Sequence, residues 1–405
     1  MTTEEMRARA AERTTFPVLD TLRAVGALAV LTTHTAFWAG AYTEHGVAGR
    51  ALARMDVGVA IFFVLSGFLL SRPWFLRAAR GAAAPELGRY YVKRLLRIMP
   101  VYLVTAVIAL ALIRENRGHD LLGWLTTLSL TDIYVHPSMP AGLTQMWSLA
   151  TELSFYLVLP LVMWLAIGRQ LRPARVLVTL SVLCIIAVLW HLGLSTQVPG
   201  VEHRAVHEWL PAFLIWFSIG IGLGLLQVLH ALGRLDRHTV ARLEAAASTP
   251  GSLWLVAAGL LLVATSPLAG PTLLTAPTEI QSLTKNLLYA GIGGAVVFSG
   301  VFTADNRWAR AMSHPLPRHL GHISYSLFCI HLPVLHLVMW LTGHDLFAGH
   351  LLQIFLLTLV LSLAASEVLY RFVEMPFMRL KDLGRAKRIV DPATTESAPT
   401  AMRTK

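Results

Sequence analysis

The first long apolar stretch of the chain, residues 18–40, carries three ionisable residues, Asp20, Arg23 and His34. Such side chains are costly inside a bilayer and usually line cavities or substrate pathways there. Arg23 and His34 are eleven residues apart, so a helix brings them back to nearly the same face, roughly 16 Å apart along its axis. We therefore predict that both line one channel and that Asp20, three residues before Arg23, tethers the guanidinium.

A carboxylate further along the chain offers a partner for His34. In the apolar stretch 147–167, Glu152 lies about two helical turns from the end that faces the same side as His34. We predict a buried His34–Glu152 pair in which the carboxylate orients an imidazole that acts as a general base. The alternative is structural: an interhelical hydrogen bond for His34, an ion pair for Glu152, and an Arg23 side chain that snorkels to the headgroups.

A dense run of basic residues follows the second apolar stretch. Its members are Arg72, Arg77, Arg80, Arg89, Lys93, Arg94 and Arg97. Arg94 and Arg97 are three residues apart and share one helix face with Tyr90. Because guanidinium groups bind phosphates through paired hydrogen bonds, we predict that Arg72, Arg94 and Arg97 bind a phosphorylated cytosolic ligand. The alternative is the ordinary excess of positive charge at a cytoplasmic membrane surface.

Membrane helices are the elements that must hold these residues. The chain has 405 residues, of which 55% are hydrophobic and only 14% charged, whereas soluble proteins carry about 25% charge. We therefore expect an all-α fold, a polytopic membrane bundle of about ten helices. The ten candidate spans are 18–40, 57–72, 98–113, 147–167, 175–194, 209–230, 252–268, 283–302, 319–342 and 351–372. The segment 121–134 is short and polar, and is expected to be interfacial or re-entrant.

The distribution of positive charge predicts the orientation. With the N-terminus inside, 27 of the 34 Lys and Arg residues fall in cytoplasmic segments, as the positive-inside rule requires. Both termini are then cytoplasmic. We divide the chain into a cytoplasmic tail (1–16), a transmembrane domain (17–380) and a polar, disordered cytoplasmic tail (381–405). The location we expect is the cytoplasmic membrane, as a multi-pass protein.

Other features narrow the functional classes. The net charge of +11 reflects topology and contacts with anionic lipids, so we expect no nucleic-acid partner. Cys184 and Cys329 lie in apolar runs without metal-ligand spacing, and we expect no metal.

The last two predicted spans carry further polar features. His331 lies near mid-membrane, and Pro333 frees a backbone carbonyl, as is common where helices kink around cavities. At the end of the last span, we expect an interfacial ion-pair network of Glu367, Arg371 and Glu374.

Six stretches together resemble the acyltransferase-3 family of integral membrane O-acyltransferases, in the family's order along almost the whole chain. They are LDTLRAVGALAVLTTH, which holds Arg-x10-His; VGVAIFFVLSGFLL; RLLR; WSLATELSFYLVLPL; ISYSLFCIHLPV; and RFVEMPF. The Arg-rich and Ala-rich composition favours actinobacterial members, including those that acylate antibiotics, glycolipids or polysaccharides.

The resemblance implies an acyltransferase of the class that transfers groups other than aminoacyl groups. Its donor is acyl-CoA, with acetyl-CoA expected, and its acceptor is a hydroxyl of a sugar, a glycolipid or a macrolide-type glycoside. His34 and Arg23 then form the catalytic core with Glu152, which falls in the family's WSL-x-x-E signature. Arg94 and Arg97 belong to the donor site, and His34 acts as a general base or carries the acyl group. The rival hypothesis is a proton-coupled secondary transporter, which also uses intramembrane His, Glu and Arg residues.

Overall fold

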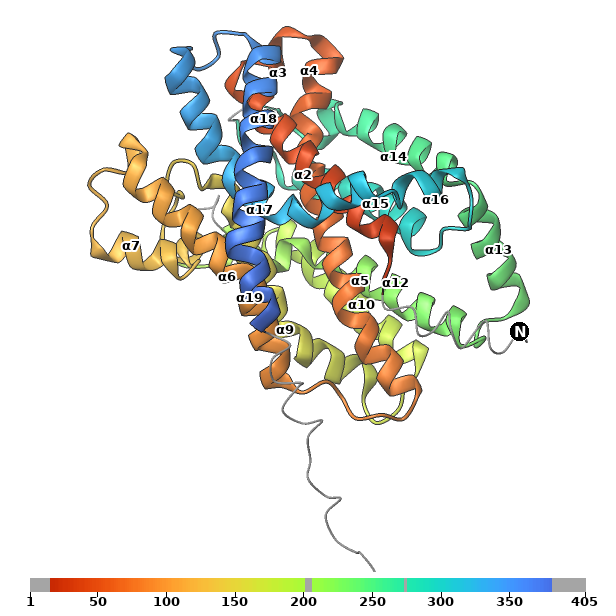
Figure 1. Ribbon diagram of the computed structural model, residues 1–405. Helices are drawn as coiled ribbons and strands as arrows, with labels where there is room; N and C mark the ends of the chain where they lie inside the picture. Colours follow the sequence, from red (N-terminus) through yellow and green to blue (C-terminus); the bar gives the residue numbers. More distant parts are fainter. Residues whose placement is uncertain (1–14, 201–205, 273–274, 381–405) are drawn as a thin grey trace, which may run out of the picture.

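The computed structural model describes residues 15–200, 206–272 and 275–380 (Figure 1). The predicted tails, 1–16 and 381–405, lie outside the described residues except for positions 15 and 16. Within the described ranges the chain forms helices and no strand. The prediction of an all-α membrane bundle is confirmed.

A helix occupies each of the ten predicted spans. The long helices are α2 (Pro17–Trp38), α5 (Gly58–Ala79), α6 (Leu87–Leu112), α9 (Trp147–Ile167), α10 (Pro173–His191), α12 (Leu214–Ala231), α14 (Pro250–Ala264), α15 (Glu279–Val301), α17 (Pro315–Thr342) and α18 (Leu351–Leu369). Shorter α-helices are α3 (Ala41–Glu44), α4 (Gly46–Ala53), α7 (Leu121–Leu128), α8 (Asp132–Val135), α13 (Arg237–Ser248), α16 (Arg307–Met312) and α19 (Met375–Leu380). The remaining turns are η1 (Arg54–Val57), η2 (Arg114–Asn116), η3 (Thr144–Met146), η4 (Leu194–Gln197), η5 (Leu210–Phe213), η6 (Pro267–Ala269) and the π-helical η7 (Tyr370–Glu374).

Seven helical segments in the described part of the chain are long and apolar enough to cross a membrane, or up to eight if α13 and α14, which meet at 77°, form one broken span. Helices α2 and α15 are not among them, although they have 22 and 23 residues. Both carry ionisable residues, and both lie inside the bundle. The number of ten spans and the orientation therefore stay predictions. The segment 121–134 forms only α7 and α8, which are too short to span.

The bundle packs around α2, α5 and α17. A Cβ atom on Gly58 of α5 would overlap the carbonyl oxygen of Gly26 on α2, and one on Gly321 of α17 would overlap that of Asp20. Glycine at these positions lets the backbones approach closely. Helix α2 is therefore held between α5 and α17.

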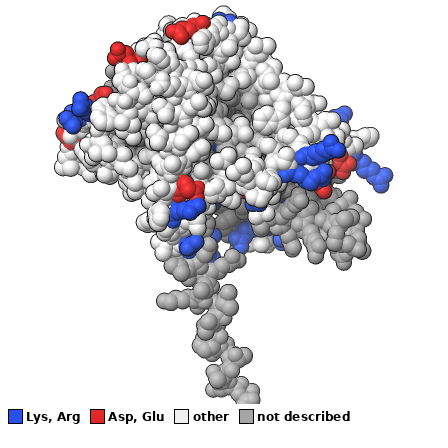
Figure 2. Space-filling view, turned by 45° about the horizontal axis from the view of Figure 1, so that its top comes forward, with Lys and Arg blue, Asp and Glu red and all other residues white. Residues whose placement is uncertain are grey.

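The outside of the bundle matches a lipid environment. Helices α12 and α17 are mostly buried, whereas α10 and the segment Leu351–Leu380 are mostly exposed although they are strongly apolar. Figure 2 shows a broad surface almost free of charged residues, with Lys and Arg gathered mainly toward its lower rim. Exposed apolar surface of this extent is expected where lipid tails cover it.

Candidate active site

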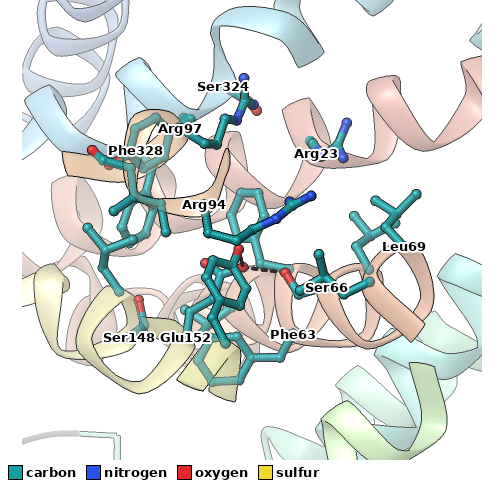
Figure 3. Close-up of a pocket in the computed structure, with 18 residues that line it drawn as sticks. Arg23, Phe63, Ser66, Leu69, Arg94, Arg97, Ser148, Glu152, Ser324 and Phe328 are labelled. Carbon is teal, nitrogen blue, oxygen red and sulfur yellow. Dashed lines mark hydrogen bonds between the residues drawn. The ribbon is translucent and has the colours of Figure 1, made fainter. Parts of the chain in front are cut away.

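Five helices enclose a cavity of about 130 Å³, which we call the arginine cavity (Figure 3). Its polar lining residues are Arg23 from α2, Ser66 from α5, Arg94 and Arg97 from α6, Ser148, Glu152 and Tyr156 from α9, and Ser324 and Tyr325 from α17. The structure thus brings four predicted site residues together: Arg23, Arg94, Arg97 and Glu152. The expected common face of Arg94 and Arg97 is confirmed, since both line this cavity.

The three arginines differ in how they are paired. Arg23 donates to Asp20 at 3.0 Å, as predicted, and Arg97 donates to Glu374 at 2.5 Å. Arg94 forms no ion pair with any described residue. Its guanidinium lies 6.0 Å from the centre of the Tyr156 ring, and its buried Nε lacks a hydrogen-bond partner in the described structure. Arg94 is therefore the arginine best placed to receive an anion.

Glu152 contacts the arginine cavity and not His34. Its carboxylate accepts hydrogen bonds from the hydroxyls of Ser66 and Tyr156, the latter at 2.7 Å, and Figure 3 shows Arg94 beside the Glu152–Ser66 pair. The predicted His34–Glu152 pair is wrong. Helix α9 packs against α5 and α6, so Glu152 points toward these helices, whereas His34 faces α17.

The partner of His34 is His331 of α17. His34 Nδ1 lies 2.9 Å from His331 Nε2, and the two rings stack with centroids 5.1 Å apart. His331 Nδ1 lies 2.8 Å from the carbonyl oxygen of Phe328. Because a carbonyl only accepts, the proton of a neutral His331 must be on Nδ1, and its Nε2 accepts from His34 Nδ1–H. This leaves His34 Nε2 with a lone pair.

A second cavity, of about 280 Å³, opens onto His34. We call it the His34 cavity; its lining includes His136, Ser138, Thr144, Trp147 and Glu208. The wall of the His34 cavity is joined to α17 by a hydrogen bond to the backbone carbonyl that Pro333 frees. Gln145 Nε2 donates to the carbonyl oxygen of Cys329 at 2.9 Å, the oxygen that the missing N–H of Pro333 leaves unpaired in the helix.

An aromatic pair links the lining of the arginine cavity to the histidine pair. Phe62 of α5 and Phe328 of α17 both line the arginine cavity, and their ring centroids are 5.9 Å apart. On the far side, the Phe328 ring lies 6.0 Å from the ring of His331. The ring of Phe328 therefore lies next to both the arginine cavity and the side chain of His331.

Two further predictions need correction. Arg72 does not line the arginine cavity; it is buried, and its Nε donates to Gln227 at 2.6 Å. Glu374 was expected in an interfacial network with Glu367, but the π-helical turn η7 carries it inward, where it is 1% exposed and bonded to Arg97 and Ser326.

The remainder of the predicted network is confirmed. Glu367 accepts from Arg371 and lies 2.8 Å from His319 Nε2. The residue that the sequence reasoning missed as a partner is His331. Its signal was present in the sequence, because it is a second histidine in an apolar helix, near mid-membrane.

The fold and the two cavities define a polytopic membrane protein with buried polar cavities inside its helix bundle. Comparison with known proteins gives the particular class. The family described as "Acyltransferase domain" matches residues 16–371, so the chain belongs to the acyltransferase-3 family. The predicted enzyme class, an acyltransferase, is confirmed at this level, and membership implies an acyl donor, a hydroxyl-bearing acceptor and a membrane setting.

Three relatives illustrate the range of the family. The chain is 22% identical to the peptidoglycan O-acetyltransferase OatA of Listeria monocytogenes, over 90% of this chain and 56% of OatA. It is 27% identical to the acyltransferase MdmB of Streptomyces mycarofaciens, over 94% of this chain and 96% of MdmB. It is 26% identical to nodulation protein 10 of Rhizobium leguminosarum, over 82% and 84% of the two chains. The chain thus spans little more than half of OatA. No solved structure matches it.

Proposed function

We propose that the protein is an O-acyltransferase of the cytoplasmic membrane. It moves an acyl group, acetyl or another short chain, from acyl-CoA to a hydroxyl of a glycan, a glycolipid or a glycosylated natural product. The observation that carries the proposal is the histidine pair: the free lone pair of His34 Nε2, next to a cavity, is the group that hydroxyl activation needs. The O-acetyltransferase among the relatives supports the same reaction.

The arginine cavity fits the donor. At about 130 Å³ it has room for the thioester end of acyl-CoA and not for the nucleotide, whose phosphates must stay at the mouth. Arg94, which forms no ion pair with a described residue, and Arg23 supply positive charge to the lining of this cavity. Charge-assisted hydrogen bonds from guanidinium groups bind phosphate and also stabilise a developing oxyanion.

His34 and His331 would carry the proton transfer. His34 Nε2 removes the proton of the acceptor hydroxyl as its oxygen attacks the thioester carbonyl carbon. The carbon–sulfur bond then breaks, and the proton passes from His34 to the CoA thiolate. His331 accepts from His34 Nδ1–H throughout, so it fixes the tautomer and stabilises the imidazolium that forms. A route in which His34 Nε2 first carries the acyl group uses the same geometry.

The test separates this function from transport. Purified protein in detergent is incubated with acetyl-CoA labelled in the acetyl group and a panel of glycosides, and the same preparation in proteoliposomes is assayed for glycoside flux. We expect label in the glycoside only when protein is present. Flux without acyl-CoA, together with no transfer of label, contradicts the proposal and favours the proton-coupled transporter.

A further inference from the structure

A long groove runs between α6 and α17, apart from the two cavities of the candidate active site. Its volume is about 500 Å³, and none of its described lining residues lines either cavity. The floor is apolar and buried, and includes Ile113, Ile330 and Val334. The rim is apolar and exposed, and includes Leu112, Leu337 and Trp340. We call this feature the α6–α17 groove.

The α6–α17 groove faces the lipid side of the bundle. Its two walls belong to segments of membrane-spanning length, Leu87–Leu112 and Pro315–Thr342, and Leu112 on the rim is 72% exposed. A water occupies about 30 Å³ and a methylene group is of similar size, so the groove has room for a chain of roughly sixteen carbons. Because a lipid chain gains little by moving between two apolar surroundings, close packing must hold it and the headgroup must supply selectivity.

Two charged residues lie at one end of the groove. Arg114 and Glu115 line it in the turn η2, just after the last residue of α6. Both are exposed, and neither forms an ion pair with a described residue. Trp340, which is 66% exposed, is near the end of α17. Tryptophan at the end of a membrane helix is typical of the headgroup level, so the groove reaches from the apolar interior to the headgroups.

The neighbouring charges of Arg114 and Glu115 discriminate among headgroups. A phosphate accepts paired hydrogen bonds from a guanidinium group, so Arg114 suits the phosphate of any phospholipid. Glu115 needs a cation with N–H donors, because a carboxylate only accepts. The primary ammonium of phosphatidylethanolamine has such donors, the quaternary ammonium of phosphatidylcholine has none, and phosphatidylglycerol carries no cation. The two side chains together are therefore complementary to a phosphoethanolamine headgroup.

We propose that the α6–α17 groove is a binding site for one phosphatidylethanolamine molecule. One acyl chain lies along the buried floor, the phosphate accepts hydrogen bonds from Arg114, and the ammonium group donates to Glu115. The site goes beyond the proposed acyl transfer and does not depend on it, since no residue of the two cavities takes part. Arg114 and Glu115 are the positions that determine headgroup specificity.

Photochemical labelling tests the headgroup. Delipidated protein in detergent is illuminated with a phosphatidylethanolamine that carries a diazirine in one acyl chain, and labelled peptides are mapped by mass spectrometry. We expect label at 108–113 and 330–340, and unlabelled phosphatidylethanolamine should compete about fivefold better than phosphatidylcholine, the upper range for an exposed ion pair. Glu115→Gln should remove this preference. The matched control is Glu44→Gln, at an exposed glutamate outside the groove, which should keep it.

A second pair of variants tests the chain. Leu337→Trp fills the groove and should abolish the label at 330–340, whereas Leu341→Trp, at an exposed leucine of the same helix outside the groove, should leave it. Equal labelling of α6, α10 and α18 would show ordinary surrounding lipid and overturn the site. A preference that survives Glu115→Gln, or stronger competition by a polyprenyl phosphate, would overturn the headgroup. Labelling requires no acyl transfer, so failure of the proposed function leaves these outcomes distinct.

Discussion

His34 Nδ1 lies 2.9 Å from His331 Nε2, and His331 is in turn held by the backbone carbonyl of Phe328. This chain of hydrogen bonds joins α2 to α17, between histidines that are 297 positions apart in the sequence. It has a fixed direction, because only His331 Nδ1 can donate to the carbonyl. The imidazole of His34 on one helix is thus oriented by a second imidazole on another.

His331 is expected to act as a positioning residue. His331→Ala should lower kcat about 100-fold or more, the range of general-base contributions, while the KM for acetyl-CoA stays nearly unchanged. His331→Gln should restore part of the rate, because an amide oxygen can accept from His34 Nδ1–H. The measurement is steady-state transfer with both substrates varied. A purely structural role would instead lower the amount of folded protein and give no rescue of kcat by glutamine.

Arg94 is expected to bind the donor. Because Arg94 forms no ion pair with any described residue, Arg94→Ala should remove a charge-assisted contact with the donor of about 1.5–3 kcal/mol and raise the Kd for acetyl-CoA about 10- to 100-fold. The control is Arg89→Ala, at an exposed arginine on the same helix outside the cavity. Binding can be measured by calorimetry in detergent. Equal affinities in the two variants would exclude Arg94 from the donor site.

The Arg97–Glu374 pair is expected to contribute to stability. Glu374 is fully buried, so Arg97→Ala leaves its charge without a partner and should destabilise the fold by on the order of 3 kcal/mol. Removing both charges in Arg97→Ala/Glu374→Gln should recover most of the loss, since contacting groups are not additive. Thermal unfolding in detergent measures both variants. A double variant as unstable as the single one would refute the coupling.

Phe62 is expected to limit the acyl group. It lines the arginine cavity and packs against Phe328, whose ring lies 6.0 Å from that of His331, so Phe62→Ala should enlarge the arginine cavity next to the histidine pair. The ratio of kcat/KM for hexanoyl-CoA over acetyl-CoA should rise about tenfold, the scale of methylene discrimination in apolar pockets. Phe372→Ala, at a phenylalanine that is 75% exposed, is the matched control. Identical acyl-length profiles would mean that the acyl group takes another route.

The sequence allowed much of the site to be predicted, because helical periodicity is regular. It predicted a shared face for Arg94 and Arg97, the Asp20–Arg23 tether and the free carbonyl before Pro333, and each depends on residues close in sequence. The same periodicity predicts that Arg23 and His34 share a face, yet in the structure they line different cavities. A shared face over three turns does not by itself make one continuous channel.

The failures concern which helices are neighbours. Glu152 was paired with His34 from their depth alone, but depth does not specify the direction in which a helix face points. Contacts between distant segments determine the direction of each helix face: α17 packs on α2, and α9 packs on α5 and α6. The inward turn of Glu374 was also hidden, because a π-helical turn shifts the register of the residues after it.

The proposed acyl transfer depends on the lone pair of His34 Nε2, which activates the acceptor hydroxyl. The most direct measurement is the rate of acetyl transfer from labelled acetyl-CoA to a glycoside acceptor by wild-type protein and by His34→Gln, at saturating donor and with acetyl-CoA binding measured in parallel. We expect the His34→Gln protein to bind acetyl-CoA normally and to transfer the acetyl group about 10²–10⁴-fold more slowly. Transfer at nearly the wild-type rate by a folded, donor-binding His34→Gln protein would contradict it.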